Sequence, residues 1–413
     1  MNIPLLLSPA GSFDSLQAAL NAGADAIYFG VEQLNMRAKS VNGFRIADLK
    51  SIAAKCHSKK AACYLTLNTI LYDHDIQLAK LIIKEAKTAK VDAVICSDIA
   101  AIELCKKEKM PIHISTQANV CNFQTAVFYA QYADLIVLAR ELTLKQTEQI
   151  IKEIKRKKIC GPSGKKLKIE IFCHGALCMA VSGKCYLSLH AQNSSANRGA
   201  CTQNCRHAYT VIDKETNTEL VIENEYIMSP KDLCTIHILD EIVRTGVDVI
   251  KIEGRTKAAD YVYTVTKCYR EALDAIKKGD YTSEAGKKWL EKLKTVYNRG
   301  FWEGYYLGRN LGEWTDNPGS IATEKKIYIG RGKKYYPKIK VAEFLIETGD
   351  LTEGDDILIM GAEMGVEKLK VKKMRVNGED KNNAHKGDLV TIPYKQKVKV
   401  SDKLYKLVGT EYA

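Results

Sequence analysis

The sequence lacks the segments that would carry a protein into or across a membrane. No stretch approaches the ~20 consecutive apolar residues that a membrane-spanning helix needs. The N-terminal run MNIPLLLSPAGS has no basic flank, and its apolar part is too short for a secretory signal peptide. We therefore expect a cytoplasmic protein with no membrane contact.

Several catalytic signatures are also missing. The chain has neither a His-Glu-x-x-His zinc helix nor a Gly-x-Ser-x-Gly nucleophile elbow, which gives proteolysis little support. Ser8-Pro-Ala-Gly11, after the first apolar run, is not the glycine-rich phosphate fingerprint of an open dinucleotide-binding sheet. These absences exclude the familiar zinc-peptidase, serine-hydrolase and Rossmann patterns.

The thirteen cysteines form an odd number, which argues against a complete disulfide set. Without an export signal, thiols are expected to be free or metal-bound in a reducing compartment. The net charge of +13 makes a polyanion such as RNA a plausible partner, although a lysine-rich solvated surface explains it equally well.

One segment concentrates the unusual chemistry. Residues 170–206 follow a β-type run and hold five cysteines, punctuated by glycines at 175, 183 and 199. Buried cysteines acting as small hydrophobes account for scattered ones, but not for five in a polar, glycine-rich loop. Gathered thiolates suit zinc or an iron–sulfur cluster. The cysteines are Cys173, Cys178, Cys185, Cys201 and Cys205.

The rest of the chain alternates short apolar runs with amphipathic segments of helical length, such as Ser12–Ala22, Asp75–Ala89 and Leu144–Lys155. Eight runs spaced in this way favour an α/β fold, a (β/α)8 TIM-like barrel whose polar strand ends form a reactive mouth. The expected strands are Pro4–Leu7, Ala26–Phe29, Ala61–Leu67, Ala93–Cys96, Ile112–Ser115, Leu135–Leu138, Leu167–Phe172 and Val247–Ile252.

The cysteine-rich insert, at about 173–235, is expected after strand seven. It should contain a hairpin between Arg206–Ile212 and Leu220–Met228, then a helix opening at Ser229 and containing Cys234. Helices Ala258–Lys278 and Ser283–Asn298 would complete a barrel domain of residues 1–315. Residues 320–413 read as a small all-β barrel domain. Its expected strands are Lys326–Gly330, Lys338–Ala342, Asp355–Met360, Val366–Val376, Asp388–Ile392 and Lys397–Val400.

The motifs resemble those of the U32 family, the so-called collagenase-like peptidases. Glu170-x-Phe-x2-Gly-Ala-Leu-Cys178-x4-Gly-x-Cys185-x-Leu-Ser188 is similar to the family signature. Ser8-Pro-Ala-Gly11, Asn197-Arg-Gly-Ala-Cys201, Lys251-Ile-Glu-Gly-Arg255 and Asn298-Arg-Gly-Phe301 agree with it. The resemblance covers the N-terminal three quarters of the chain, and the two-domain layout looks most like the members that hydroxylate tRNA.

The resemblance implies a [4Fe–4S] cluster bound by Cys178, Cys185, Cys201 and Cys205, with Cys234 as the competing fourth ligand. It also implies oxygen-independent hydroxylation that draws on prephenate and converts the wobble uridine of tRNA to 5-hydroxyuridine. The expected partners are then the anticodon region of tRNA, the small molecule prephenate and, in some members, a homologous U32 protein.

Prephenate carries two carboxylates, which the planar forks of arginine bind best. Our candidates are Arg37, Arg198 and Arg255, each of which could instead pair with an acid at the barrel rim. Glu253 is a candidate catalytic carboxylate or could orient Arg255, and His174 could move a proton or be structural. Two rival functions remain open: a peptidase, and a non-enzymatic RNA-binding protein with a structural metal.

Overall fold

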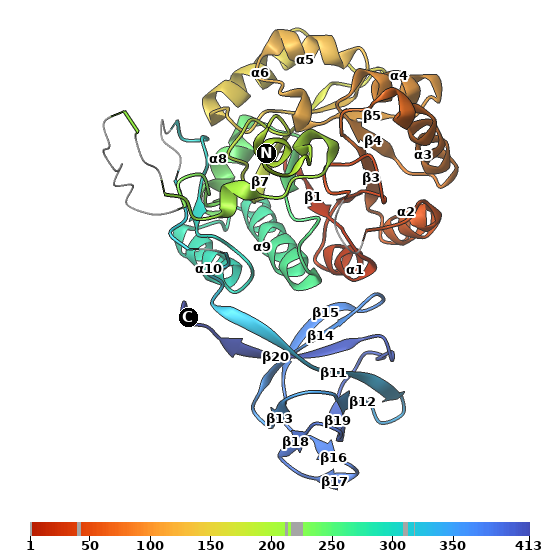
Figure 1. The fold of residues 1–413 in the computed structure, drawn as a ribbon, viewed down its shortest axis with the longest axis vertical. Helices are drawn as coiled ribbons and strands as arrows, with labels where there is room; N and C mark the ends of the chain where they lie inside the picture. Colours follow the sequence, from red (N-terminus) through yellow and green to blue (C-terminus); the bar gives the residue numbers. More distant parts are fainter. Residues whose placement is uncertain (1, 39–42, 211–213, 216–225, 309–312, 318) are drawn as a thin grey trace.

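The N-terminal part of the chain folds into a closed barrel of parallel strands surrounded by helices (Figure 1). The computed structural model describes residues 2–38, 43–210, 214–215, 226–308, 313–317 and 319–413. Strand β9 pairs with both β1 and β7, so the sheet closes and the expected (β/α)8 barrel is confirmed. Its strands are β1 (Leu5–Pro9), β2 (Ala26–Phe29), β3 (Ala62–Leu67), β4 (Ala93–Cys96), β5 (Ile112–Ile114), β6 (Leu135–Val137), β7 (Lys168–Gly175) and β9 (Val249–Ile252).

The strands are short and apolar because the barrel interior covers one face and the helices cover the other. Helix α6 (Leu144–Arg156) shows the helical pattern, since Leu144, Ile150, Ile151 and Ile154 are buried while its lysines face solvent. No helix in the described ranges is long and apolar enough to cross a bilayer. The outer helices are α1 (Phe13–Asn21), α2 (Leu49–Ser58), α3 (Ile76–Thr88), α4 (Ile99–Lys107), α5 (Phe123–Ala130), α6 (Leu144–Arg156), α8 (Leu239–Thr245) and α9 (Ala259–Lys278).

The segment after Ser229 corrects one expectation. The sequence predicted a helix containing Cys234, but Asp232–Cys234 is strand β8, which pairs antiparallel with the end of β7. A second short strand, β10 (Phe301–Trp302), then joins β8 in parallel. Strand pairing is favoured over the helix predicted from Ser229-Pro230, because it gives the buried backbone N–H and C=O groups hydrogen-bond partners. The insert also carries a short helix, α7 (Leu187–Gln192). The predicted hairpin between Arg206–Ile212 and Leu220–Met228 falls partly outside the described residues; in its described part, Arg206 ends a 3-10 helix, Asn204–Arg206, and residues 207–210 are not in a strand.

The C-terminal part is an antiparallel all-β domain, preceded by helix α10 (Ser283–Lys294). The predicted strand at Lys397–Val400 is wrong, since the last strand, β20, spans Lys403–Gly409. Val366–Val376 is likewise two strands rather than one. The strands are β11 (Glu324–Tyr336), β12 (Val341–Ile346), β13 (Asp350–Thr352), β14 (Asp356–Gly361), β15 (Gly365–Lys370), β16 (Arg375–Val376), β17 (Glu379–Asp380), β18 (Asn383–His385), β19 (Leu389–Pro393) and β20 (Lys403–Gly409).

The two parts of the molecule meet where β14 and β15 pack on α1 and α9. In Figure 1 the C-terminal domain lies below the barrel, next to these helices. Ala18 and Ala259 form a small apolar cluster with Leu358, Met360 and Val366. The amide of Asn21 on α1 donates to the carbonyl oxygen of Met364 at 2.7 Å. The contact depends on small side chains, so it should be sensitive to added volume.

Gly365 provides a test of this contact. Its φ is +79°, and a Cβ there would lie 3.1 Å from the backbone nitrogen of Ala18. Gly387 also has a positive φ, +97°, but a Cβ there would meet nothing within 4 Å. Both Gly→Ala changes should cost about 1–2 kcal/mol of backbone strain. We expect Gly365→Ala to cost about 1 kcal/mol more through crowding, measured as the free energy of unfolding in urea. Equal losses in the two variants would contradict a tight interface.

Candidate functional site

The principal cavity lies at the C-terminal ends of the barrel strands, where the cysteine-rich insert folds over them. Its volume is about 330 Å³. Tyr28 of β2, Thr66 of β3 and Glu253, which follows β9, line it from the barrel side. Residues of the insert between 176 and 206 line it from the other side. The cavity is therefore enclosed jointly by the rigid barrel and by the segment that the sequence singled out.

All four cysteines expected to bind a cluster line this cavity. Cys185 and Cys205 are half-buried, whereas Cys178 and Cys201 are exposed. Burial raises the pKa of the Cys205 thiol, and the nearby thiols of Cys178, Cys201 and Cys185 raise it further, against the lowering effect of Arg206. The four thiols therefore lie along one cavity and are close enough to influence one another electrostatically. A set of four thiols is a suitable donor set for an iron–sulfur cluster or for zinc.

Two glycines let the insert approach the barrel rim. Gly183 and Gly199 both have positive φ, +77° and +81°. A Cβ at Gly183 would collide with the side-chain oxygen of Gln117, and one at Gly199 would collide with the carbonyl oxygen of Asn35. These positions therefore require glycine for both conformation and space.

Two arginines hold the insert in place through its backbone. Arg140, just after β6, donates to the carbonyl oxygen of Ala176 at 3.1 Å and to the hydroxyl of Ser182 at 2.9 Å. Arg206, directly after Cys205, donates to the carbonyl oxygen of Leu177 at 2.6 Å. Both guanidinium groups line the cavity and bind neutral acceptors, so their positive charge is not cancelled by these bonds.

The charge of the cavity is strongly biased toward positive. Glu253 accepts hydrogen bonds from Arg37 and Tyr28, each at 2.8 Å. Burial opposes its ionisation, but Arg37 and Arg255 lower the pKa of Glu253 to about 2, so the carboxylate is charged at neutral pH. Among the described residues, it is the single acidic side chain of the lining. The basic ones are Arg37, Arg140, Arg206, Lys251, Arg255 and Arg299.

Arg255 has unused hydrogen-bonding capacity. Its Nη1 donates to Thr66 Oγ1 at 2.6 Å and to Asn35 Oδ1 at 3.0 Å. Its buried Nε has no hydrogen-bond partner among the described residues, and burial lowers the pKa of the guanidinium. An unpaired buried donor on a cation is costly, so an anion that accepted from it would be favoured. By contrast, the charge of Lys251 is met by Glu170, at 2.8 Å.

Three predicted residues lie outside the cavity lining. His174 is buried among the rings of Tyr261, Tyr269 and Phe301, and burial lowers its pKa to about 3, so it is neutral at physiological pH. Arg198 pairs with Asp75 and lies over the ring of Tyr72. Cys234 is fully buried on β8, and burial raises its pKa to about 12. These placements suit structural roles better than contact with a substrate.

The structure adds residues that the sequence reasoning did not select. Tyr28, Arg140, Arg206 and Lys251 all line the cavity. Arg140 follows the predicted strand Leu135–Leu138, so the sequence already placed it at the mouth of the barrel, although not among the candidate anion-binding residues. Arg206 could have been found from its position next to the last cysteine of the cluster set.

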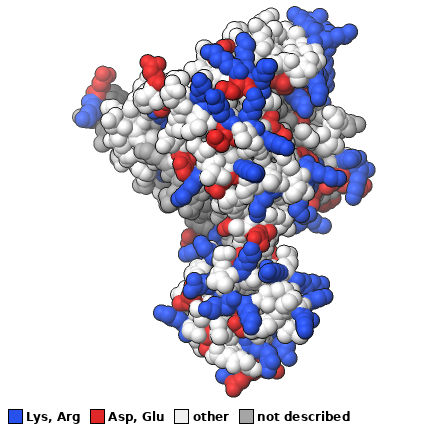
Figure 2. All heavy atoms as spheres, turned by 90° about the vertical axis from the view of Figure 1, so that its right-hand side faces the viewer, with Lys and Arg blue, Asp and Glu red and all other residues white. Residues whose placement is uncertain are grey.

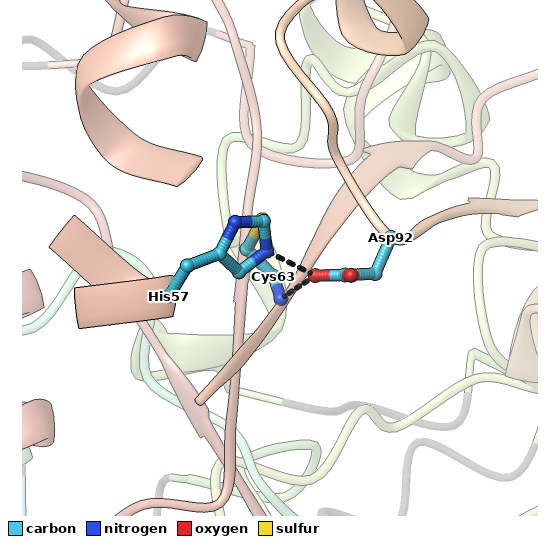
Figure 3. A group of neighbouring side chains, drawn as sticks. All are labelled: His57, Cys63 and Asp92. Carbon is cyan, nitrogen blue, oxygen red and sulfur yellow. Dashed lines mark hydrogen bonds and ion pairs between the residues drawn. The ribbon is translucent and has the colours of Figure 1, made fainter. Parts of the chain in front are cut away.

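A second cluster of polar side chains lies on the opposite, N-terminal face of the barrel. His57 lies in the last turn of α2, Cys63 lies near the start of β3, and Asp92 immediately precedes β4; Figure 3 shows their side chains converging. Since parallel strands begin at the end opposite to the mouth, this cluster is separated from the cavity by the barrel core.

The fold and the site define a (β/α)8-barrel protein with a thiol-lined cationic cavity at its C-terminal face. The chain belongs to peptidase family U32, whose family model matches residues 11–316. A collagenase of Porphyromonas gingivalis is 52% identical over 97% of both chains. The tRNA hydroxylation protein P1 of Bacillus subtilis is 32% identical over 74% of this chain and 71% of its own length. A 23S rRNA 5-hydroxycytidine synthase of Escherichia coli is 37% identical over 66% of this chain and 39% of its own.

The positions of Cys205 and Cys234 give a paired prediction. If the thiols of the cavity bind a cluster, Cys205→Ser should abolish its broad visible absorption and its iron content in anaerobically purified protein. Cys234→Ser should leave both unchanged, because this thiol lies outside the lining. Iron retained by Cys205→Ser and lost by Cys234→Ser would reverse the ligand assignment. Cys178→Ser, Cys185→Ser and Cys201→Ser should behave like Cys205→Ser.

Proposed function

We propose that this protein hydroxylates RNA, forming 5-hydroxyuridine at the wobble position of tRNA without molecular oxygen. The observation that carries the proposal is that one cavity is lined by four thiols and by three guanidinium groups with no ion pair among the described residues, those of Arg140, Arg206 and Arg255. Arg37 and Arg299, by contrast, pair with Glu253 and Asp232. The relatives named as a tRNA hydroxylation protein and an rRNA hydroxycytidine synthase support an RNA hydroxylation role.

We assign a [4Fe–4S] cluster to Cys178, Cys185, Cys201 and Cys205. Soft thiolate donors, gathered from one glycine-rich segment onto a shared cavity, fit such a group. When bound, it would supply one-electron redox chemistry next to the substrate. Arg206 lies beside Cys205 and lowers its pKa, so its charge would help to offset the negative charge of bound thiolates.

We assign prephenate, the proposed source of the hydroxyl group, to the cationic side of the same cavity. Its two carboxylates need donors that other acids have not already taken. Arg255 offers an unpaired Nε, and the hydrogen bonds of Arg140 go to neutral acceptors. Arg37 is one-third exposed and shares its charge with Glu253. In this arrangement Glu253 positions the guanidinium groups rather than contacting the anion.

The size of the cavity favours a single base over a polymer chain. A volume of about 330 Å³ is at the lower end of small-molecule sites. A base can enter such a site only if it leaves its stack, which costs least for nucleotides in a single-stranded loop. The wobble base of an anticodon loop meets this condition. The lining also contains the amides of Asn68 and Gln117, which offer donors and acceptors suited to the edge of uracil.

The C-terminal domain offers a surface for the RNA backbone. The hairpin between β11 and β12 exposes Lys333, Lys338 and Lys340, with Tyr335 and Tyr336 alongside. Lysines with interleaved aromatic rings are typical of nucleic-acid contact. Figure 2 shows Lys and Arg side chains spread over both the barrel and the C-terminal domain on one side of the molecule. We infer that this domain positions the tRNA while the barrel modifies it.

Peptidase activity is the second candidate, because a relative of high identity is named collagenase. The geometry gives it less support. In the His57, Cys63 and Asp92 cluster the thiol and the carboxylate both approach the same nitrogen, Nε2 of His57, so Asp92 does not orient the ring for proton transfer as a catalytic triad requires. A hydrogen bond with Cys56 and burial raise the pKa of Cys63, which opposes formation of a nucleophilic thiolate.

The reaction can be tested by nucleoside mass spectrometry of bulk tRNA. Deleting the gene should remove 5-hydroxyuridine and its derivatives, and the wild-type gene should restore them. A host blocked before prephenate should not be complemented. Persistence of hydroxyuridine in the deletion strain, with no homologue to replace the protein, would refute the assignment. Peptide cleavage that survives removal of the metal would favour the peptidase.

Arg255→Lys provides a residue-level test in the same strain. Lysine keeps the positive charge but loses the planar fork, so we expect product formation to fall by about 10- to 100-fold, equivalent to one or two charged hydrogen bonds. The cluster should remain, as judged by iron content. Arg198→Lys is the comparison, because that arginine pairs with Asp75 outside the cavity. A larger loss in Arg198→Lys than in Arg255→Lys would contradict the proposed anion site.

The role of the hairpin is tested by salt dependence. The double variant Lys333→Ala/Lys338→Ala should weaken tRNA binding and reduce the slope of log affinity against log salt by up to about 2. Lys368 and Lys381 are matched controls on the same domain, because each is paired with a glutamate. Their double alanine variant should keep the wild-type slope. Equal slopes in all three proteins would remove the hairpin from the RNA interface.

A further inference from the structure

The cluster on the N-terminal face has the composition and spacing of a metal site. One ligand atom from each of His57, Cys63 and Asp92 lies within 4.8 Å of the other two. His57 Nε2 is 2.9 Å from Asp92 Oδ2 and 4.0 Å from Cys63 Sγ. Zinc bonds of about 2.0–2.3 Å in tetrahedral geometry would separate such ligands by about 3.3–3.6 Å. The two distances from His57 Nε2 lie on either side of this range, so small shifts would bring the other two ligand atoms to suitable distances from it.

The backbone holds the carboxylate in position for this role. Asp92 Oδ2 also accepts the backbone N–H of Cys63 at 2.8 Å, while the backbone N–H of Asp92 donates to the carbonyl oxygen of Cys63 at 3.0 Å. These bonds fix the carboxylate at the edge where β3 and β4 begin. Oδ2 is also the carboxylate oxygen next to His57 Nε2, and its second lone pair would bind the metal in place of the hydrogen bond with His57. Outer hydrogen bonds of this kind orient ligands and increase metal affinity.

The three side chains differ in exposure in a way that suits a bound ion. The Cys63 thiol is buried, whereas His57 and Asp92 each leave 40% of the side chain exposed. A metal could therefore enter from solvent and keep a water molecule as its fourth ligand. Cys56 forms a hydrogen bond with Cys63 from the buried side and could support the sulfur without binding the metal.

We propose that His57, Cys63 and Asp92 bind one zinc ion, or another thiol-binding divalent cation, at the N-terminal face of the barrel. The mixed sulfur, nitrogen and oxygen donor set is one that zinc accepts and that magnesium and calcium do not favour. The ion would join the end of α2 to the starts of β3 and β4, so its role would be structural. This site is independent of the proposed function, since the barrel core separates it from the cavity.

The test is metal analysis of the cluster-loaded protein after equilibration with micromolar zinc and passage over a weak chelating resin. We expect about one zinc per chain in addition to the iron of the cluster, with zinc and iron quantified separately. His57→Gln and Asp92→Asn should each weaken zinc binding by at least about tenfold, because even outer partners of a metal change affinity by 10- to 100-fold. Both variants should keep their iron, and both avoid altering the buried Cys63.

His74→Gln is the matched control. His74 also pairs with an aspartate, Asp75, at 3.5 Å, and it is more exposed than His57, but the described residues place no thiol in that pair. It should bind zinc as tightly as the wild type. The proposal would be overturned if the wild-type protein bound no zinc. It would also be overturned if His57→Gln and Asp92→Asn both retained zinc, because the zinc would then be bound elsewhere. Loss of iron with unchanged zinc binding would count only against the assignment of the iron–sulfur cluster.

Discussion

The mouth of the barrel depends on the pairing of one carboxylate, Glu253, with the cations around it. Its side chain binds Arg37 and Tyr28, and its backbone N–H donates to the carbonyl oxygen of His174 at the end of β7. Without this negative charge, Arg37 and Arg255 would repel each other across a largely desolvated space. The charge also remains in place over the whole physiological range, because the pKa of Glu253 is about 2. One fixed anion thus keeps several guanidinium groups together while leaving the cavity with an excess of positive charge.

Much of the fold could be predicted from the sequence, because a parallel barrel uses short apolar strands at regular spacing and each strand is a local signal. The cysteine positions were equally informative, since five thiols in a polar glycine-rich segment have few structural uses. The errors came from pairing between distant segments. Asp232–Cys234 has the sequence of a helix start, but its partners are the end of β7 and the strand at Phe301–Trp302. No local pattern contains that information.

The candidate arginines show the same limit at the level of the site. Arg37 and Arg255 reach the cavity, whereas Arg198 pairs with Asp75, which lies just before α3; this is the ion pair with a rim acid that the sequence left open as the alternative. A position after a strand or beside a cysteine indicates that a residue lies near the mouth. It does not indicate which way the side chain points. The direction depends on the hydrogen-bond acceptor to which the guanidinium group donates, and that acceptor belongs to another segment of the chain. For the same reason Arg140 enters the cavity although no motif marks it.

The docking of the C-terminal domain has a consequence for the order of folding. The helices it packs on, α1 and α9, flank β1 and β9, the two strands whose pairing closes the barrel. β1 and β9 are separated by most of the sequence of the barrel domain. Closing so long a loop has a high entropic cost, so the pairing of these two strands is expected to form late. The surface on which the C-terminal domain packs is complete only when both α1 and α9 are in place. Because the C-terminal domain follows the barrel in the chain and is synthesised after it, its docking on α1 and α9 would slow reopening of the finished barrel.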